Sequence, residues 1–161
     1  MLRPAVPADD IRILDWNEND VHFLAPMDTA RLGYLRERAH AVEIIQVGAA
    51  AAGFVITFLE DADYDSPNYR WFADREPTFH YVDRIVIDPH HRGQGLAGKV
   101  YAVLAARFPA RPMCAEVNID PPNRASMAFH QAAGFTEVGR SGSQPNGVVL
   151  LVRAPQSPTR G

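Results

Sequence analysis

The sequence contains little lysine, little cysteine and no long apolar run. Lys99 is the only lysine, and 16 basic against 19 acidic residues give a formal net charge of -3. The chain lacks the basic excess that nucleic acids and anionic membranes attract, so we expect neither as a partner. Cys114 is the only cysteine, which excludes an intrachain disulfide and a cysteine cluster. No apolar run approaches the roughly 20 residues that cross a bilayer.

These absences predict a cytoplasmic protein. A chain with a single cysteine suits a reducing compartment. The first ten residues lack the apolar segment of a signal peptide. His80, His90 and His91 show no spacing typical of a metal site, so we expect no metal.

The 161 residues, of which 47% are hydrophobic, suit one domain with a continuous core. We expect a single domain over residues 1–154 and a flexible tail over residues 155–161. The order of elements is a meander of strands, then strand, helix, strand and helix, and finally a hairpin. This order predicts a mixed α/β sheet with helices on both faces.

Apolar periodicity and turn residues set the expected boundaries. We expect strands at residues 2–6, 42–47, 54–59, 78–87, 113–118, 135–138 and 148–152. We expect helices at residues 9–16, 28–39, 93–108 and 123–133. The segments between them are expected to be a helix end at Asn17–Asp20, hairpin turns at 48–53 and 141–147, and a long polar loop at 60–77.

One stretch, residues 85–98, joins a strand, a glycine-rich turn and a helix. Ile85-Val86-Ile87 is typical of a buried strand, and glycines at 93, 95 and 98 lead into an apolar helix. The first amides of a helix have no intrahelical partner, and the helix dipole adds roughly half a positive charge there. Glycines allow a phosphate to approach the backbone closely. The stretch therefore predicts a site for a pyrophosphate.

Two interpretations of this stretch compete. Residues 93–98 match G-x-G-x-x-G, the dinucleotide fingerprint, and Glu116 lies where a ribose-binding acid would follow. This interpretation predicts an NAD-dependent oxidoreductase, and it is the weaker one. In the fingerprint the first glycine follows the strand almost directly, whereas Asp88–Arg92 intervene here. Only 63 residues follow Gly98, too few for several further strand–helix units.

The other interpretation begins at Arg92, which with Gly95 and Ala97 gives the pattern R-x-x-G-x-A. Placed after Ile85–Pro89, this pattern resembles motif A of the GNAT superfamily of acyl-CoA N-acyltransferases. A second block resembles motif B and consists of Glu116-Val117-Asn118, Asn123, Ser126, Phe129-His130 and Gly134-Phe135. The resemblance covers about residues 81–139, and the chain is similar to a bacterial branch of predicted acetyltransferases.

The resemblance implies a fold, a co-substrate and a reaction. The fold would be a mixed, mostly antiparallel central sheet of about six to seven strands flanked by about four helices. The enzyme would transfer an acetyl group from acetyl-CoA to a primary amine by direct attack in a ternary complex, without a metal. The acceptor would be a small-molecule amine or a peptide, and a homodimer is one assembly state open to the chain.

The resemblance also implies how the coenzyme is held. Backbone amides at positions 92–98 would hold the pyrophosphate, the strand at 85–87 would pair with the pantetheine arm, and Asn123 would contact that arm. The residues implied in coenzyme binding are Ile85, Val86, Ile87, Arg92, Gly93, Gln94, Gly95, Leu96, Ala97, Gly98, Asn118, Asn123, Ser126 and Phe129.

Glu116 is the candidate general base. Alternation along the strand at 113–118 places it on one face with Cys114 and Asn118. A carboxylate on a central strand is costly unless it is paired or faces a cleft, where it would suit proton transfer. It also matches a glutamate that some members of the superfamily use as base. The alternative is a structural ion pair with Arg84 or Arg124.

His130 and Asp83 are the other acid–base candidates. His130 stands where many members have the tyrosine that protonates the leaving thiolate, and an imidazole titrates near neutral pH. The alternative for His130 is a polar helix residue without a role. Since adjacent helix residues cannot share a face, we expect Phe129 in the core and His130 elsewhere. Asp83 is either a second acid–base residue or an ion-paired structural one. Adjacent strand residues point to opposite faces, so we expect no ion pair between Asp83 and Arg84.

The expected acceptor site is aromatic and carries amide groups. Its candidate residues are Asn17, Asn68, Tyr69, Trp71, Phe72 and Tyr81. The aromatic residues at 71 and 72 would equally suit a lid or a dimer contact. The alternative function from another class is a non-catalytic acyl-CoA-binding or sensing module, with the same glycine turn but no working acid or base.

Overall fold

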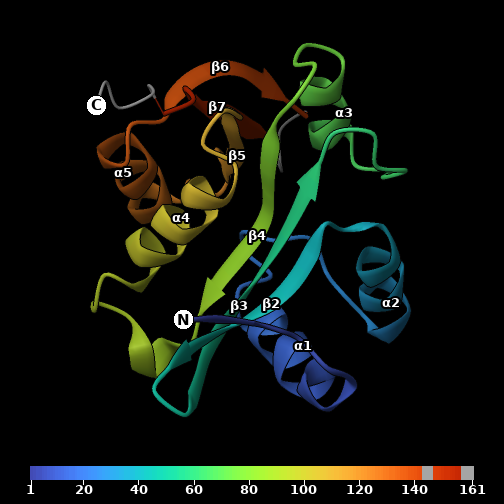
Figure 1. Cartoon of the computed structure of the whole chain (residues 1–161), viewed down its shortest axis with the longest axis vertical. Coiled ribbons are helices and arrows are strands. Elements are labelled where there is room, and N and C mark those ends of the chain that lie inside the picture. Colours follow the sequence, from blue (N-terminus) through green and yellow to red (C-terminus); the bar gives the residue numbers. More distant parts are fainter. Residues whose placement is uncertain (143–146, 157–161) are drawn as a thin grey trace. The chain divides into compact units, whose positions relative to one another are not determined.

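The computed structural model describes residues 1–142 and 147–156. The strands form a seven-stranded sheet in the order β1-β2-β3-β4-β5-β7-β6 (Figure 1). The strands are β1 (Leu2–Pro4), β2 (Ala41–Val47), β3 (Ala50–Leu59), β4 (His80–Ile87), β5 (Met113–Asn118), β6 (Thr136–Ser141) and β7 (Val148–Arg153). The α-helices are α1 (Asp10–Asn19), α2 (Thr29–Arg38), α3 (Pro67–Ala73), α4 (Leu96–Arg107) and α5 (Arg124–Ala132).

The sheet is mixed and mostly antiparallel, which confirms the predicted fold class. β1 with β2, β2 with β3, β5 with β7 and β6 with β7 all pair antiparallel. β4 pairs in parallel with β5 through His80↔Met113 and Tyr81↔Cys114. The described residues form one α-helix more than the four expected, because α3 was not predicted.

The chain forms two compact units. The first comprises Met1–Phe58 and Val82–Ala102, and the second comprises Leu59–Tyr81 and Val103–Gly161. β4 and α4 contribute residues to both. The single domain expected over residues 1–154 stays a prediction. Within the tail expected at 155–161, residues 157–161 lie outside the described part of the chain, as do residues 143–146 of the turn expected at 141–147.

Helices α1 and α2 bury apolar side chains in the core of the first unit. Trp16 of α1 stacks on Phe54 of β3 with ring centroids 6.3 Å apart. Leu32 and Leu35 supply the buried face of α2, and the Asp28 side chain caps this helix by accepting a hydrogen bond from the Arg31 N–H. The apolar periodicity therefore predicts the buried face of α2, but in α1 only Ile13 and Trp16 of the expected apolar set are buried and Ile11 is 83% exposed.

α1 ends at Asn19, inside the stretch Asn17–Asp20 that was expected to break it, but it continues past Asn17. Asn17 is fully buried, and its amide group has partners inside the protein. Its Nδ2 donates to the Ala25 carbonyl at 3.0 Å, and its Oδ1 accepts from Arg84 at 2.9 Å. An asparagine that finds such tertiary partners no longer competes for the helix backbone, so the local tendency to break the helix is overridden.

The hairpin turn between β2 and β3 is shorter than predicted. β3 begins at Ala50 and not at Phe54, which leaves Gly48 and Ala49 as the turn. Gly53 therefore lies inside the strand, next to a register shift at Ile45/Gln46. An ideal Cβ on Gly53 would come within 2.0 Å of the Val86 carbonyl oxygen, so the bare glycine is what permits this close approach to β4.

The loop predicted at 60–77 contains α3. Ser66 caps this helix by accepting from the Tyr69 N–H at 3.3 Å, and Pro67 occupies its first position. Tyr69 and Phe72 of α3 pack against Tyr81 with ring centroids 5.6 and 5.8 Å apart. The serine–proline pair was the available signal for a helix start, and a helix of seven residues is too short to show clear periodicity.

Glu60 and Arg111 form a bidentate ion pair in the second unit. Arg111 donates to Glu60 Oε1 at 2.6 Å and to Oε2 at 3.2 Å. These bonds lower the pKa of Glu60 from 4.5 to about 2. The carboxylate therefore contributes stability that is fully present above pH 4.5 and is lost as the pH falls through about 2.

We expect Glu60→Gln to lower the free energy of unfolding by about 1 to 2 kcal/mol at pH 7, since the pair is partly solvent-screened. The difference from the wild-type protein should shrink steadily between pH 5 and pH 2 in urea titrations. A difference that stays constant with pH would contradict this assignment.

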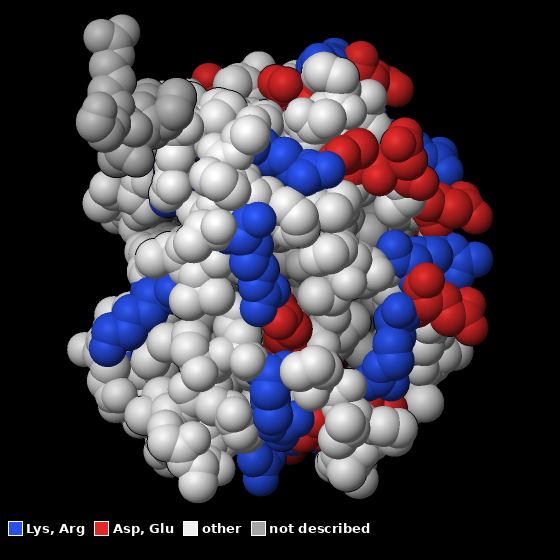
Figure 2. All heavy atoms as spheres, in the orientation of Figure 1, with Lys and Arg blue, Asp and Glu red and all other residues white. Residues whose placement is uncertain are grey.

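Among the described residues, no helix has the length and apolar character needed to span a membrane. Basic and acidic side chains are interspersed on the face shown in Figure 2. This distribution agrees with the small net charge of -3.

Candidate functional site

The turn between β4 and α4, residues 88–95, has the backbone of an anion site. Gly93 and Gly95 adopt φ values of 76° and 70°, the left-handed region that favours glycine. α4 begins only at Leu96, so the helix predicted from Gly93 starts three residues too early. The first helical hydrogen bond of α4 runs from the Lys99 N–H to the Gly95 carbonyl at 3.2 Å. The amides of Leu96, Ala97 and Gly98 thus precede the first helical bond and can bind an anion.

The Arg92 side chain stabilises this turn through two contacts within the protein. Its Nε donates to the Ile87 carbonyl at 3.1 Å, and a terminal nitrogen lies 3.1 Å from Asp20 Oδ1 just beyond α1. The side chain is half exposed. In this arrangement Arg92 shapes the turn, and the backbone amides are left to meet the ligand.

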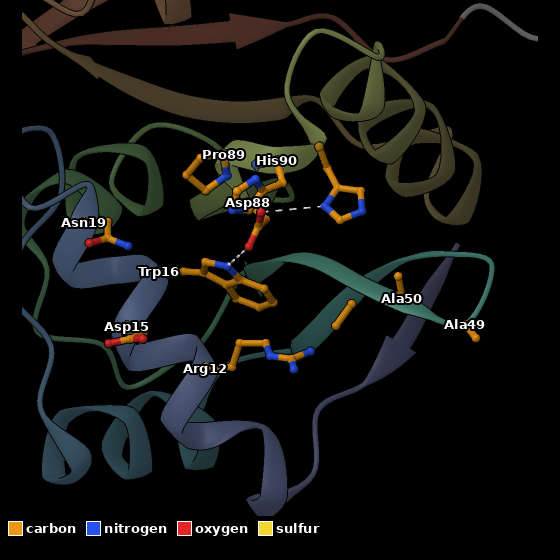
Figure 3. Close-up of a pocket in the computed structure, with 11 residues that line it drawn as sticks. Arg12, Asp15, Trp16, Asn19, Ala49, Ala50, Asp88, Pro89 and His90 are labelled. Atoms are coloured by element: carbon orange, nitrogen blue, oxygen red, sulfur yellow. Dashed lines mark hydrogen bonds and ion pairs between the residues drawn. The ribbon is translucent and has the colours of Figure 1, made fainter.

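A hollow of about 670 Å³ borders the turn in the first unit (Figure 3). In the close-up Trp16 and Asp88 point toward each other from α1 and from the end of β4. The residues that line the hollow are Arg12, Asp15, Trp16, Asn19, Ala49, Ala50, Ala51, Asp88, Pro89, His90 and His91.

Asp83 and Arg84 form an ion pair, so the expectation that they could not pair is wrong. Arg84 Nε lies 2.9 Å from Asp83 Oδ2, and both side chains are 5% exposed. An arginine side chain is long enough to reach the neighbouring carboxylate, which alternation along a strand does not forbid. Arg84 also donates to Asn17 and to the Ala25 carbonyl, at 2.9 and 3.2 Å. These contacts favour the structural alternative for Asp83.

In the second unit Glu116 is held by Tyr81. The tyrosine hydroxyl donates to Glu116 Oε2, and the two residues come from β4 and β5. Glu116 is half-buried while its neighbours Ala115 and Val117 are buried, as the predicted alternation requires. A carboxylate that accepts a tyrosine hydrogen bond is oriented, and its second oxygen can accept a proton from a bound group. The sequence placed Tyr81 among acceptor contacts and did not foresee this pairing.

His130 and Phe129 exchange the positions expected for them. His130 is 4% exposed and Phe129 is half-buried, because α5 turns the histidine toward Phe135, with ring centroids 5.1 Å apart. The Nδ1 of His130 lies 2.7 Å from the Ser126 carbonyl, so this nitrogen carries the hydrogen. Burial lowers the pKa of His130, and the ring is neutral at pH 7.

The remaining motif B residues shape the start of α5. Asn123 caps the helix by accepting from the Ser126 N–H at 3.2 Å, and its own N–H donates to the Asn118 carbonyl at 3.2 Å. Asn118 ends β5 and is half-buried.

Burial raises the pKa of Cys114, so this thiol is protonated at neutral pH and is a poor nucleophile.

The acceptor candidates differ in exposure. Asn17, Tyr69, Phe72 and Tyr81 are buried, whereas Asn68 and Trp71 are half-buried. The Tyr69 hydroxyl donates to the Leu59 carbonyl at 2.7 Å, which gives it a structural role. The Trp71 ring lies over Gly139, where an ideal Cβ would come within 2.5 Å of it. Trp71 and Asn68 are therefore the candidates with surface left for a ligand.

Among the described residues, no group of three or more histidine, cysteine, aspartate or glutamate side chains is placed to hold a metal ion. The hydrogen bond between Trp16 and Asp88 was not predicted from the sequence. The only signal was an aspartate followed by proline, which is typical of a residue that caps a turn.

Solved structures place the fold in a class. NAA60 from Arabidopsis thaliana, in complex with acetyl-CoA, has a TM-score of 0.69 and 14% identity, with 96% of this chain and 98% of that chain covered. Naa50 from Arabidopsis thaliana, in complex with the bisubstrate analogue CoA-Ac-MVNAL, gives 0.68 and 10%, with 96% and 97% covered. YncA from Salmonella typhimurium, with acetyl-CoA, gives 0.66 and 19%, with 100% and 96% covered. At these identities the similarity shows the acetyltransferase fold.

The family follows from the sequence. A family model described as "Acetyltransferase (GNAT) family" matches residues 7–135. The chain therefore belongs to the GNAT acetyltransferase family, which confirms the resemblance and the expected enzyme class, an acyltransferase. No curated protein matches the chain in sequence.

Proposed function

We propose that this chain transfers an acetyl group from acetyl-CoA to a primary amine by direct attack within a ternary complex. The observation that carries the proposal is the β4–α4 turn, in which two left-handed glycines lead directly into the first amides of α4, which precede its first helical hydrogen bond. The motif that forms this turn lies inside the part of the chain that matches the family.

Coenzyme binding is assigned to backbone groups. The amides at Gly93–Gly98 would hold the pyrophosphate, because they offer several donors and the positive end of a helix. Open space around Gly93 and Gly95 leaves room for the phosphates, since nothing lies within 4 Å of an ideal Cβ at either position. Ile85, Val86 and Ile87 follow the residues of β4 that pair with β5, and an extended pantetheine arm can bind such a strand as a peptide would.

Deprotonation of the amine is assigned to Glu116. The amine must lose a proton to attack the acetyl carbon, and Glu116 would take it directly or through a water. Tyr81 supports this role because its hydrogen bond fixes the orientation of the carboxylate. As the thioester carbonyl gains charge it needs a donor, and a backbone amide near Val86 or Ile87 would supply one.

The proton for the leaving thiolate is assigned to His130. Since its Nδ1 donates to the Ser126 carbonyl, only Nε2 can gain and release a proton. Burial lowers the pKa of the ring, so the protonated form is scarce at neutral pH and is a strong donor when formed. Asp83 is the weaker acid–base candidate because Arg84 neutralises it.

The acceptor is proposed as a small-molecule amine or a peptide amine. The net charge of -3 gives a mild preference for a cationic acceptor. Naa50 was solved with an analogue that joins CoA to the peptide MVNAL, which supports including peptide N-termini among the candidates. Trp71 and Asn68 are the proposed contacts with the acceptor.

The first experiment measures thermal stabilisation by CoA and by NAD. We expect CoA to raise the melting temperature, since binding to the folded state alone stabilises it, and NAD to have no effect. Stabilisation by NAD and not by CoA would replace the proposal with the oxidoreductase interpretation. Stabilisation by CoA without turnover of any amine would favour the sensing module.

A further inference from the structure

Three contacts converge on the Asp88 carboxylate, at the point where β4 gives way to the turn. Its Oδ2 accepts from Trp16 Nε1 at 2.7 Å, and its Oδ1 accepts from the His90 N–H at 2.8 Å (Figure 3). Oδ1 also lies 3.7 Å from His91 Nδ1. The Asp88 N–H donates to the Ala52 carbonyl of β3 at 2.8 Å. One residue therefore joins the turn to a helix and to a strand of the same unit.

Trp16, the partner from α1, is itself firmly held. It is 4% exposed and stacks on Phe54 with an interplanar angle of 16°. An indole with so little freedom presents its N–H at a fixed position, so the bond to Asp88 transmits the position of α1 to the turn. The hydrogen bond from Trp16 is also the main reason that the pKa of Asp88 is lowered, because it stabilises the charged carboxylate.

The far end of the same segment is tied to the same helix. Arg92 reaches Asp20, the residue after α1, and also bonds the Ile87 carbonyl at the end of β4. The segment from Asp88 to Arg92 is thus fastened at both ends, and the amides proposed to hold a pyrophosphate come immediately after it. A turn that is already ordered does not lose conformational freedom when a ligand binds, and its donors need no reorganisation.

We propose that Asp88 and Trp16 are positioning residues for coenzyme binding. They do not touch the coenzyme; their hydrogen bond sets the place of the β4–α4 turn and so the aim of the amides from Gly93 onward. The inference rests on the proposed function, because it needs CoA to be the ligand of that turn. Nothing in the family pattern R-x-x-G-x-A includes either residue.

The test uses Asp88→Asn, Trp16→Phe and the double variant. Asp88→Asn keeps the shape of the side chain but cannot accept from both donors, and Trp16→Phe removes the indole N–H. Glu18→Gln is the matched control. Glu18 is an exposed residue of α1, the helix that contains Trp16, and its substitution removes one negative charge as Asp88→Asn does. The dissociation constant for CoA is measured by calorimetry, and hydrogen exchange is followed over residues 86–100.

Each single variant should weaken CoA binding about tenfold, the loss expected for one hydrogen bond to a charged group. Because Trp16→Phe removes one partner of the contact that Asp88→Asn disturbs, the two losses should be less than additive in the double variant. Exchange should rise over residues 86–100 and not over β1 and α2, and the control should match the wild type.

Two results would overturn the inference. One is unchanged CoA affinity in both single variants when the wild type binds CoA. The other is a fall in melting temperature with exchange raised throughout the first unit, which would make the contact merely structural. A wild-type protein that binds no CoA would instead refute the proposed function itself, and the inference would fail with it.

Discussion

Replacing Glu116 by glutamine is expected to lower kcat at least about 100-fold, the range reached by removing a general base. Glutamine keeps the size of the side chain and can still accept the hydrogen bond from Tyr81, so the local structure should survive. The amide cannot take the proton from the attacking amine. The KM for acetyl-CoA should change little, because the coenzyme is assigned to other residues. The measurement is kcat and KM for an accepted amine across pH 6 to 9.

Glu137→Gln is the matched control for this experiment. Glu137 is a surface residue of β6 that bonds Arg140 at 2.8 Å, so the substitution changes the same charge away from the proposed chemistry. We expect it to leave kcat unchanged. If Glu116→Gln retains the activity and the pH profile of the wild type, the assignment of the base is wrong.

Gly53→Ala is expected to destabilise the protein by on the order of 3 kcal/mol, or to prevent folding. A Cβ at this position would meet the Val86 carbonyl oxygen at 2.0 Å, and backbone cannot yield as the end of a flexible side chain can. The φ of 151° adds strain for any residue with a Cβ. The measurement is the free energy of unfolding from urea titration.

Gly48→Ala separates conformational strain from the clash. Gly48 also has a positive φ, 59°, but nothing lies within 4 Å of an ideal Cβ there. Its replacement should cost only about 1 kcal/mol. Equal losses for Gly48→Ala and Gly53→Ala would show that close approach to Val86 does not constrain the strand.

Sequence reasoning succeeded where local signals and tertiary packing agree. The strand Met113–Asn118 was predicted with its observed bounds, since alternation and flanking prolines both delimit it. α5 was predicted within one residue at each end, because Asn123 caps its start and Gly134 follows its end with a φ of 91°. The glycine turn after Arg92 could likewise be predicted, because a backbone with positive φ favours glycine and the family pattern contains a glycine there.

The errors arose where distant residues decide the outcome. Asn17 continues a helix because its side-chain oxygen accepts a buried hydrogen bond from Arg84, and no short window of sequence contains both residues. His130 is buried because Phe135 packs against it, which the rule of adjacent helix faces does not reveal. The pairing of Tyr81 with Glu116 depends on the parallel register of β4 and β5, in which Tyr81 lies opposite Cys114.

The measurement that tests the central claim most directly is thiol release from acetyl-CoA over a panel of amines and peptides, with mass analysis of the products. We predict release that depends on the amine, with one acetylated product formed for each thiol and a loss of rate in Glu116→Gln. CoA binding without amine-dependent release from any member of the panel, or release that Glu116→Gln leaves unchanged, would contradict that claim.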